Sequence, residues 1–178
     1  MVKKHIVLGV TGSIAAYKAA DLANNLTKKG HEVAAILTRN ATEFISPLTF
    51  QTLTKRAAHT NAFEKITDFD VDHVGLAKWA DILLIAPATA NIIGKIAAGI
   101  ADDMLTTVIA AAHNKPVVIC PAMNTAMYEN PIICENIKNL SKMGYLFIEP
   151  RESVLACGDL GKGALADIDV IIDFVERL

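Results

Sequence analysis

Apolar, β-branched runs alternate with helix-forming segments along the 178 residues of the chain. This alternation indicates parallel strands, because a helical crossover returns the chain so that the next strand starts in the same direction. The predicted strands are 5–10, 32–38, 57–60, 81–86, 116–120 and 145–148. The predicted helices are 14–29, 42–54 with a break at Ser46-Pro47, 72–79, 92–98, 104–113, 131–143 and 167–178. We expect one domain over residues 1–178, an α/β, Rossmann-like (flavodoxin-like) doubly wound parallel sheet in three α/β/α layers.

The composition excludes several classes of protein. The chain is 52% hydrophobic and 20% charged with a net charge of −2, so it lacks the basic surface that nucleic-acid binding requires. No apolar run is long enough for a membrane span or a signal peptide. The three cysteines are odd in number and lack Cys-x-x-Cys spacing, which argues against disulfides and a metal site. We expect a cytoplasmic protein, with some apolar surface covered by another subunit.

Three predicted loops at the carboxyl edge of the sheet carry small and hydrogen-bonding residues. Gly9–Ser13 joins the first strand to a helix, where free N–H groups suit a phosphate, although a plain tight turn is an equal reading. Thr38 ends the second strand, either as a phosphate ligand or as a cap. Ala86–Ile92 adds a stiff proline and small residues beside Thr89 and Asn91. FMN fits this slot better than a dinucleotide, because the glycine fingerprint and the ribose-binding acid are missing.

The segment from Cys120 to Pro131 follows another predicted strand at the same edge. Its Pro121-Ala122-Met123-Asn124 sequence makes a stiff turn that points one carboxamide into a crevice. An Asn carboxamide can donate to a carboxylate and accept from an amide at once. This arrangement suits an acidic substrate.

Two further side chains are candidates for chemistry. His73 lies near a predicted helix start, which keeps an imidazole neutral and able to act as a base; a surface or capping histidine is the alternative. Cys157 lies in the glycine-rich stretch 156–163, predicted as a loop, where a thiol can donate a proton or attack a ligand. Many lone loop cysteines are inert, so this residue alone decides nothing.

These motifs occur in the order typical of one known family: Gly-Val-Thr-Gly-Ser, a lone His, Ala-Pro-Ala-Thr-Ala-Asn, Pro-Ala-Met-Asn and Ala-Cys-Gly. Over nearly its whole length the chain resembles the homo-oligomeric flavin-containing cysteine decarboxylases, and within them the branch that acts on 4′-phosphopantothenoylcysteine in coenzyme A biosynthesis. The resemblance implies FMN at a subunit interface, a homotrimer or an assembly of trimers, and a separate ligase that makes the substrate. The FMN contacts that it implies are Gly12, Ser13, Ile14, Thr38, Thr89, Ala90, Asn91, Ile92 and Ala122.

The implied reaction is a decarboxylation without net redox change. Oxidation of the thiol-bearing carbon gives a thioaldehyde, its C=S accepts the electron pair as CO₂ leaves, and reduction of the ene-thiolate gives 4′-phosphopantetheine. The resemblance implies His73 as acid/base, Asn124 as carboxylate holder and Cys157 as proton donor for the return step. Met127 and Lys162 are further implied substrate contacts, with Lys162 pairing with the substrate phosphate.

The chain departs from the family pattern at two positions, and other readings stay open. Tyr128 stands where the family often has Trp, and Ala164 stands where it often has Arg. A flavin prenyltransferase shares the fold but is expected to lack Pro-Ala-Met-Asn and Ala-Cys-Gly. A non-catalytic flavin-binding regulatory subunit could lose His73 or Cys157, and this chain retains both residues.

Overall fold

Six parallel strands form the central sheet of the computed structural model, which describes residues 2–61, 72–154, 158 and 160–178. Their spatial order is β3-β2-β1-β4-β5-β6. The strands are β1 (His5–Val10), β2 (Glu32–Leu37), β3 (Ala58–His59), β4 (Ile82–Ala88), β5 (Val117–Pro121) and β6 (Leu146–Phe147). The chain runs outward from β1 in one direction and then from β4 in the other, so the order reverses between these two central strands. Ligands of doubly wound sheets bind at this switch point, beyond the carboxyl ends of the strands.

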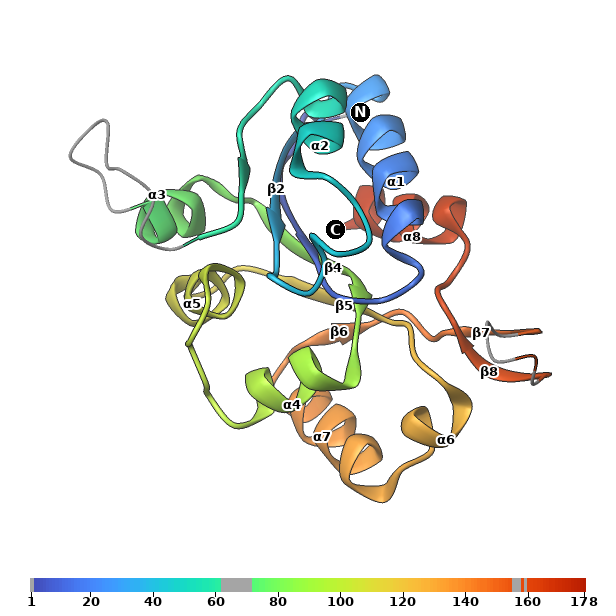
Figure 1. Ribbon diagram of the computed structural model, residues 1–178. Coiled ribbons are helices and arrows are strands. Elements are labelled where there is room, and N and C mark those ends of the chain that lie inside the picture. The colour runs from blue at the N-terminus through green and yellow to red at the C-terminus, as the bar shows by residue number, and fades with distance from the viewer. Residues whose placement is uncertain (1, 62–71, 155–157, 159) are drawn as a thin grey trace.

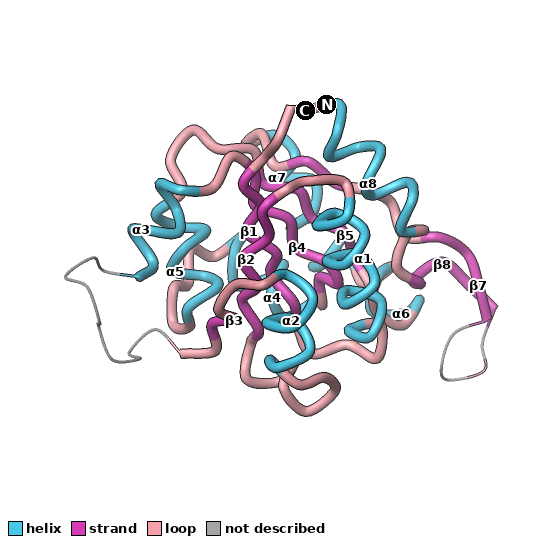
Figure 2. Tube along the Cα trace, turned by 90° about the horizontal axis from the view of Figure 1, so that it is seen from above, coloured by secondary structure: helices cyan, strands magenta, loops and turns pink. Residues whose placement is uncertain are grey.

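Helices cover both faces of the sheet, so the predicted three-layer arrangement is confirmed (Figures 1 and 2). One apolar cluster joins the sheet to α1 (Ala16–Lys28), α2 (Pro47–Thr54) and α8 (Ile168–Arg177). The other joins it to α3 (Asp72–Trp79), α4 (Ala90–Ala97), α5 (Met104–Ala111) and α7 (Pro131–Lys142). Residues of β1 alternate between the two clusters, with Ile6 and Leu8 in the first and Val7 in the second. A strand buried on both faces explains the continuous apolar runs of the sequence.

The predicted break at Ser46-Pro47 is confirmed, but the helix before it is absent. Residues 41–45 form turns, and α2 starts only at Pro47. Ser46 has extended backbone angles and its hydroxyl accepts a hydrogen bond from Leu48 N–H, as an N-cap does. The residue before a proline avoids helical angles, which is why the helix cannot continue backward through this point.

The glycine-rich stretch predicted as a loop contributes a strand to a hairpin. β7 (Arg151–Val154) pairs antiparallel with β8 (Leu160–Ala164), outside the main sheet. Figure 1 shows this hairpin extending past the sheet beside α6 (Thr125–Tyr128), a short helix that follows the Pro-Ala-Met-Asn turn. Glycine has low strand propensity, so the sequence of β8 does not reveal its pairing.

Strand β8 packs closely on α6. The N–H of Met123 donates to Gly163 O at 2.9 Å, and a Cβ on Gly161 would clash with the side chain of Thr125. A glycine is therefore required where the two segments meet. Within the described part of the chain, no helix has the length and apolarity to cross a bilayer.

Candidate active site

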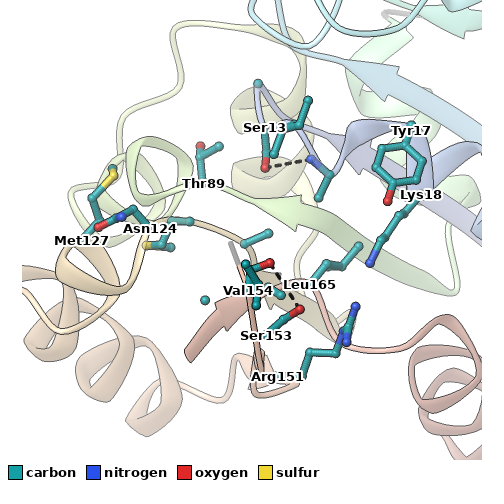
Figure 3. A pocket seen from close by; sticks show the side chains of 17 residues that line it. Ser13, Tyr17, Lys18, Thr89, Asn124, Met127, Arg151, Ser153, Val154 and Leu165 are labelled. Atoms are coloured by element: carbon teal, nitrogen blue, oxygen red, sulfur yellow. Dashed lines mark hydrogen bonds between the residues drawn. The ribbon is translucent and has the colours of Figure 1, made fainter. Parts of the chain in front are cut away.

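A cavity of about 540 Å³ lies at the carboxyl edge of the sheet, within the usual size of small-molecule sites (Figure 3). Its walls come from the start of α1, the turns after β4 and β5, α6 and the β7–β8 hairpin. The lining residues are Gly12, Ser13, Ile14, Ala15, Tyr17, Lys18, Thr89, Ala122, Met123, Asn124, Met127, Arg151, Ser153, Val154, Gly163, Ala164 and Leu165. Seven residues that the sequence singled out thus meet at one site: Gly12, Ser13, Ile14, Thr89, Ala122, Asn124 and Met127.

The turn between β1 and α1 is built around Gly12. A Cβ at this position would lie 2.5 Å from Cβ of Asn40 and 3.1 Å from its carbonyl carbon. Because one of these atoms is backbone, a side chain here would push the turn away from the segment after β2. Beside it, the Ser13 hydroxyl accepts from Ala15 N–H at 3.2 Å.

Thr11 connects the turn between β1 and α1 to the turn after β4. The sequence analysis did not select this residue. Its buried hydroxyl donates to Pro87 O at 2.7 Å and accepts from Thr89 N–H at 3.1 Å. The side chain of Thr89 in turn caps α4 by accepting from Ile92 N–H. The bridging role depends on β1 and β4 being neighbours, which the local sequence around Thr11 does not show.

Backbone and side-chain hydrogen bonds fix the Pro-Ala-Met-Asn turn. The N–H of Ala122 donates to Ala88 O at 2.9 Å, which ties this turn to the end of β4. The side-chain oxygen of Asn124 accepts from Ala126 N–H at 2.9 Å and so caps α6. Asn124 is thereby held in the cavity wall, with Met127 beside it in the view of Figure 3.

Four implied flavin contacts lie outside the cavity lining. Thr38 follows the end of β2, and its hydroxyl accepts a hydrogen bond from Ala41 N–H at 3.3 Å within a turn, where no helix starts. Ala90 and Ile92 are buried at the start of α4, whereas Asn91 is exposed.

Two further sequence candidates, His73 and Lys162, also lie outside the cavity lining. His73 lies on α3, whose Leu76, Ala77 and Trp79 pack on the sheet face opposite α1, so one chain does not bring it to the cavity (Figure 1). Lys162 pairs with Glu149 and is not part of the lining. Cys157 lies outside the described residues.

The cavity also contains residues that the sequence analysis did not select, among them Tyr17, Lys18, Arg151 and Ser153. A signal existed for Lys18, because in the predicted helix 14–29 it follows Ile14 by four residues, about one helical turn. No comparable signal existed for Arg151 and Ser153, since their position depends on the hairpin.

Cys120 is not a candidate nucleophile. It is fully buried in β5, and burial raises the pKa of its thiol, so the reactive thiolate does not form. Cys134 is exposed on α7 and its thiol donates to Tyr128 O. Among the described residues, no three His, Cys, Asp or Glu side chains gather as metal ligands would.

The family model described as Flavoprotein matches residues 1–178. The chain belongs to the flavoprotein family. The chain is similar to "Probable phosphopantothenoylcysteine decarboxylase" of Streptococcus mutans, with 50% identity over 175 residues and 98% of each chain covered. It is 47% identical to "Coenzyme A biosynthesis bifunctional protein CoaBC" of Bacillus subtilis, over 98% of this chain but only 43% of that protein.

Solved structures similar to this chain also include a PPC decarboxylase and an FMN-binding protein. A Cys-to-Ser mutant of PPC decarboxylase complexed with pantothenoylaminoethenethiol has a TM-score of 0.90 and 36% identity, covering 99% of this chain and 98% of that one. "The FMN binding protein AtHal3" has a TM-score of 0.86 and 36% identity, covering 99% and 96%. The resemblance to flavin-containing cysteine decarboxylases is confirmed, as is a flavin cofactor.

Proposed function

We propose that this flavoprotein catalyses the FMN-dependent decarboxylation of 4′-phosphopantothenoylcysteine to 4′-phosphopantetheine. The observation that carries the proposal is the placement of Asn124, capped onto α6, in the wall of a cavity at the switch point of the sheet. The relative from Streptococcus mutans, 50% identical over nearly the whole chain, bears the name of this activity.

The residues present fit a flavin. Gly12, Ala122 and Gly163 line the cavity and let a planar ring approach the backbone, while Ser13 and Thr89 offer hydroxyl groups beside it. The turn that leads from β1 into α1 lines the cavity with Gly12, Ser13 and Ile14, and a helix N-terminus suits the single phosphate of FMN. When bound, FMN supplies an acceptor for two electrons from the thiol-bearing carbon and returns them after CO₂ has left.

Asn124 would hold the carboxylate that leaves. A neutral carboxamide binds the carboxylate without the strong stabilisation that a cation gives, so the carboxylate can lose neutral CO₂ and leave its electron pair on the substrate at lower cost. Met127, on the single turn of α6 that Asn124 caps, would pack on the cysteinyl part of the substrate.

His73 would act as the acid/base from a neighbouring chain, and Cys157 would supply the proton in the return step. His73 lies away from the cavity of its own chain, which supports a homo-oligomer in which sites form between subunits. Ile14, Val154 and Leu160 are apolar, 61%, 68% and 78% exposed, and lie on the segments around the cavity. Such a rim supports coverage by a second copy, within a trimer or an assembly of trimers.

The test of this function follows the product by mass. Purified yellow protein is mixed with 4′-phosphopantothenoylcysteine, and CO₂ release and products are measured beside the Cys157→Ser variant. We expect CO₂ and 4′-phosphopantetheine from the wild type, and a product two hydrogens short from the variant. If flavin-loaded protein releases no CO₂, the decarboxylase hypothesis is wrong, and a flavin prenyltransferase or a regulatory subunit is favoured.

We expect the enzyme in the cytoplasm, together with a separate ligase.

A further inference from the structure

The two ends of the cavity differ in chemistry. Thr89, Asn124 and Met127 lie at one end, and Tyr17, Lys18 and Arg151 lie at the other (Figure 3). The first end offers neutral hydrogen-bonding groups, and the second offers two positive charges. Lys18 and Arg151 come from different elements, α1 and β7, so the hairpin brings the second charge to the first.

Neither cation is neutralised within the cavity. Lys18 is half-buried, and among the described residues its ammonium has no hydrogen bond or ion pair. Arg151 has its Nε 3.2 Å from Oδ1 of Asp167, a carboxylate outside the cavity lining that is 68% exposed. The two terminal guanidinium nitrogens of Arg151 have no recorded partner among the described residues, and Figure 3 shows them on the side of Lys18.

No Asp or Glu is among the described residues that line the cavity. Two like charges that face one partly enclosed space repel each other more strongly than in bulk water. A bound anion would offset this repulsion. A guanidinium matches two phosphate oxygens at once, and an ammonium adds a point charge, so the pair is best suited to a phosphomonoester.

We propose that Lys18 and Arg151 form the subsite for the phosphate of the substrate, an inference that rests on the proposed decarboxylation. The substrate has its carboxylate at one end and its phosphomonoester at the other, and the cavity presents Asn124 and the two cations at opposite ends. Lys162, for which the sequence implied this role, instead has its ammonium 2.5 Å from Glu149. The phosphate of FMN has the same chemistry, so the experiment separates the two sources.

The experiment compares substrates with and without the phosphate on flavin-loaded protein. The variants are Lys18→Gln, Arg151→Gln and the double variant, with Lys142→Gln as a control that removes an exposed lysine of α7. The value of kcat/KM is measured for 4′-phosphopantothenoylcysteine and for pantothenoylcysteine. We expect each single variant to lower the preference for the phosphorylated form about 10-fold, the size of one charge-assisted contact, with the unphosphorylated form within about twofold.

Two further measurements keep the subsite and the proposed function separable. Calorimetric affinities for 4′-phosphopantetheine and pantetheine need no turnover. If the wild type binds the phosphorylated compound more tightly but releases no CO₂, the proposed function is wrong and the phosphate subsite is still supported. Affinities of apo-protein for FMN and riboflavin locate the phosphate: weaker FMN binding with unchanged riboflavin binding in the variants would assign the cations to the flavin and overturn the proposal. Equal losses for both substrates, or no preference in the wild type, would overturn it as well.

Discussion

The ammonium of Lys162 lies 2.5 Å from Oε2 of Glu149, and the hydroxyl of Tyr128 donates to the same oxygen at 2.9 Å. These three residues come from β8, the segment before β7, and α6, so one carboxylate joins the hairpin to the helix that Asn124 caps. Lys162, and then the Tyr128 hydroxyl, hold the pKa of Glu149 below its usual range despite partial burial. Tyr128, which replaces the family's frequent Trp, keeps a donor at this position.

Glu149→Gln should weaken activity more than stability. The pair is exposed, at 63% and 41% for the two side chains, so its loss should cost less than about 1 kcal/mol of the free energy of unfolding. The Asn124 turn should loosen, and kcat/KM for decarboxylation should fall about 3-fold to 10-fold. Urea unfolding and steady-state rates measure the two effects. Glu135→Gln, which breaks the exposed Glu135–Lys138 pair on α7, is the matched control. An equal loss of kcat/KM in this control would contradict the inference that Glu149 supports the Asn124 turn.

Gly12→Ala should impair the flavin end of the cavity. The new methyl would meet Asn40, including its backbone, so we expect about 1–3 kcal/mol lower stability and clearly weaker FMN binding. Gly94→Ala on α4 has open space around it and should stabilise the helix by about 0.5–1 kcal/mol. Thermal unfolding and flavin fluorescence titration check both variants. If Gly12→Ala binds FMN with the wild-type affinity, the close approach of Gly12 to Asn40 is not needed for flavin binding.

The free energy of unfolding should fall as the pH drops below about 6.5, the ordinary pKa of a histidine, because of His31. Burial, with smaller contributions from Lys4 and Lys29, lowers the pKa of His31, while Glu176 opposes the shift. A lowered folded-state pKa means that the unfolded chain binds a proton first, so this stability exists above the unfolded pKa of about 6.5 and is lost as the pH falls through the folded value. Urea unfolding at several pH values measures the slope. His31→Gln should flatten it relative to His113→Gln, whereas equal slopes in the two variants would contradict this origin.

Chains that lack different catalytic groups should complement each other. If His73 serves the cavity of a neighbouring chain, His73→Gln and Asn124→Ala homo-oligomers should both be inactive. Co-expressed chains should assemble sites in which both groups are intact, about a quarter of the total for random mixing of equal amounts. Decarboxylation by the purified mixture measures this fraction. Inactive mixtures that contain both chains would place His73 in the site of its own chain or outside the chemistry.

The sequence predicts the central sheet well because the signal is local. Each buried strand is a continuous apolar run, and Ser46-Pro47 marks the start of α2 by its own backbone chemistry. The site was only partly predictable. Gly12, Thr89 and Asn124 follow strand ends and so could be placed at one edge, whereas Arg151 reaches the cavity only through the hairpin pairing. His73 lies on α3 and outside the cavity lining of its chain, which its place in the sequence does not show.

The most direct test of the central claim compares wild type, Asn124→Asp and Asn124→Ala for release of labelled CO₂ from carboxyl-labelled 4′-phosphopantothenoylcysteine. All three proteins should fold and bind FMN, since Asp can still cap α6 and Ala removes only one cap. We predict rapid release by the wild type and a loss of at least about 100-fold in both variants, because Asp repels the carboxylate and Ala cannot hold it. Flavin-loaded Asn124→Ala that releases CO₂ at the wild-type rate would contradict the account.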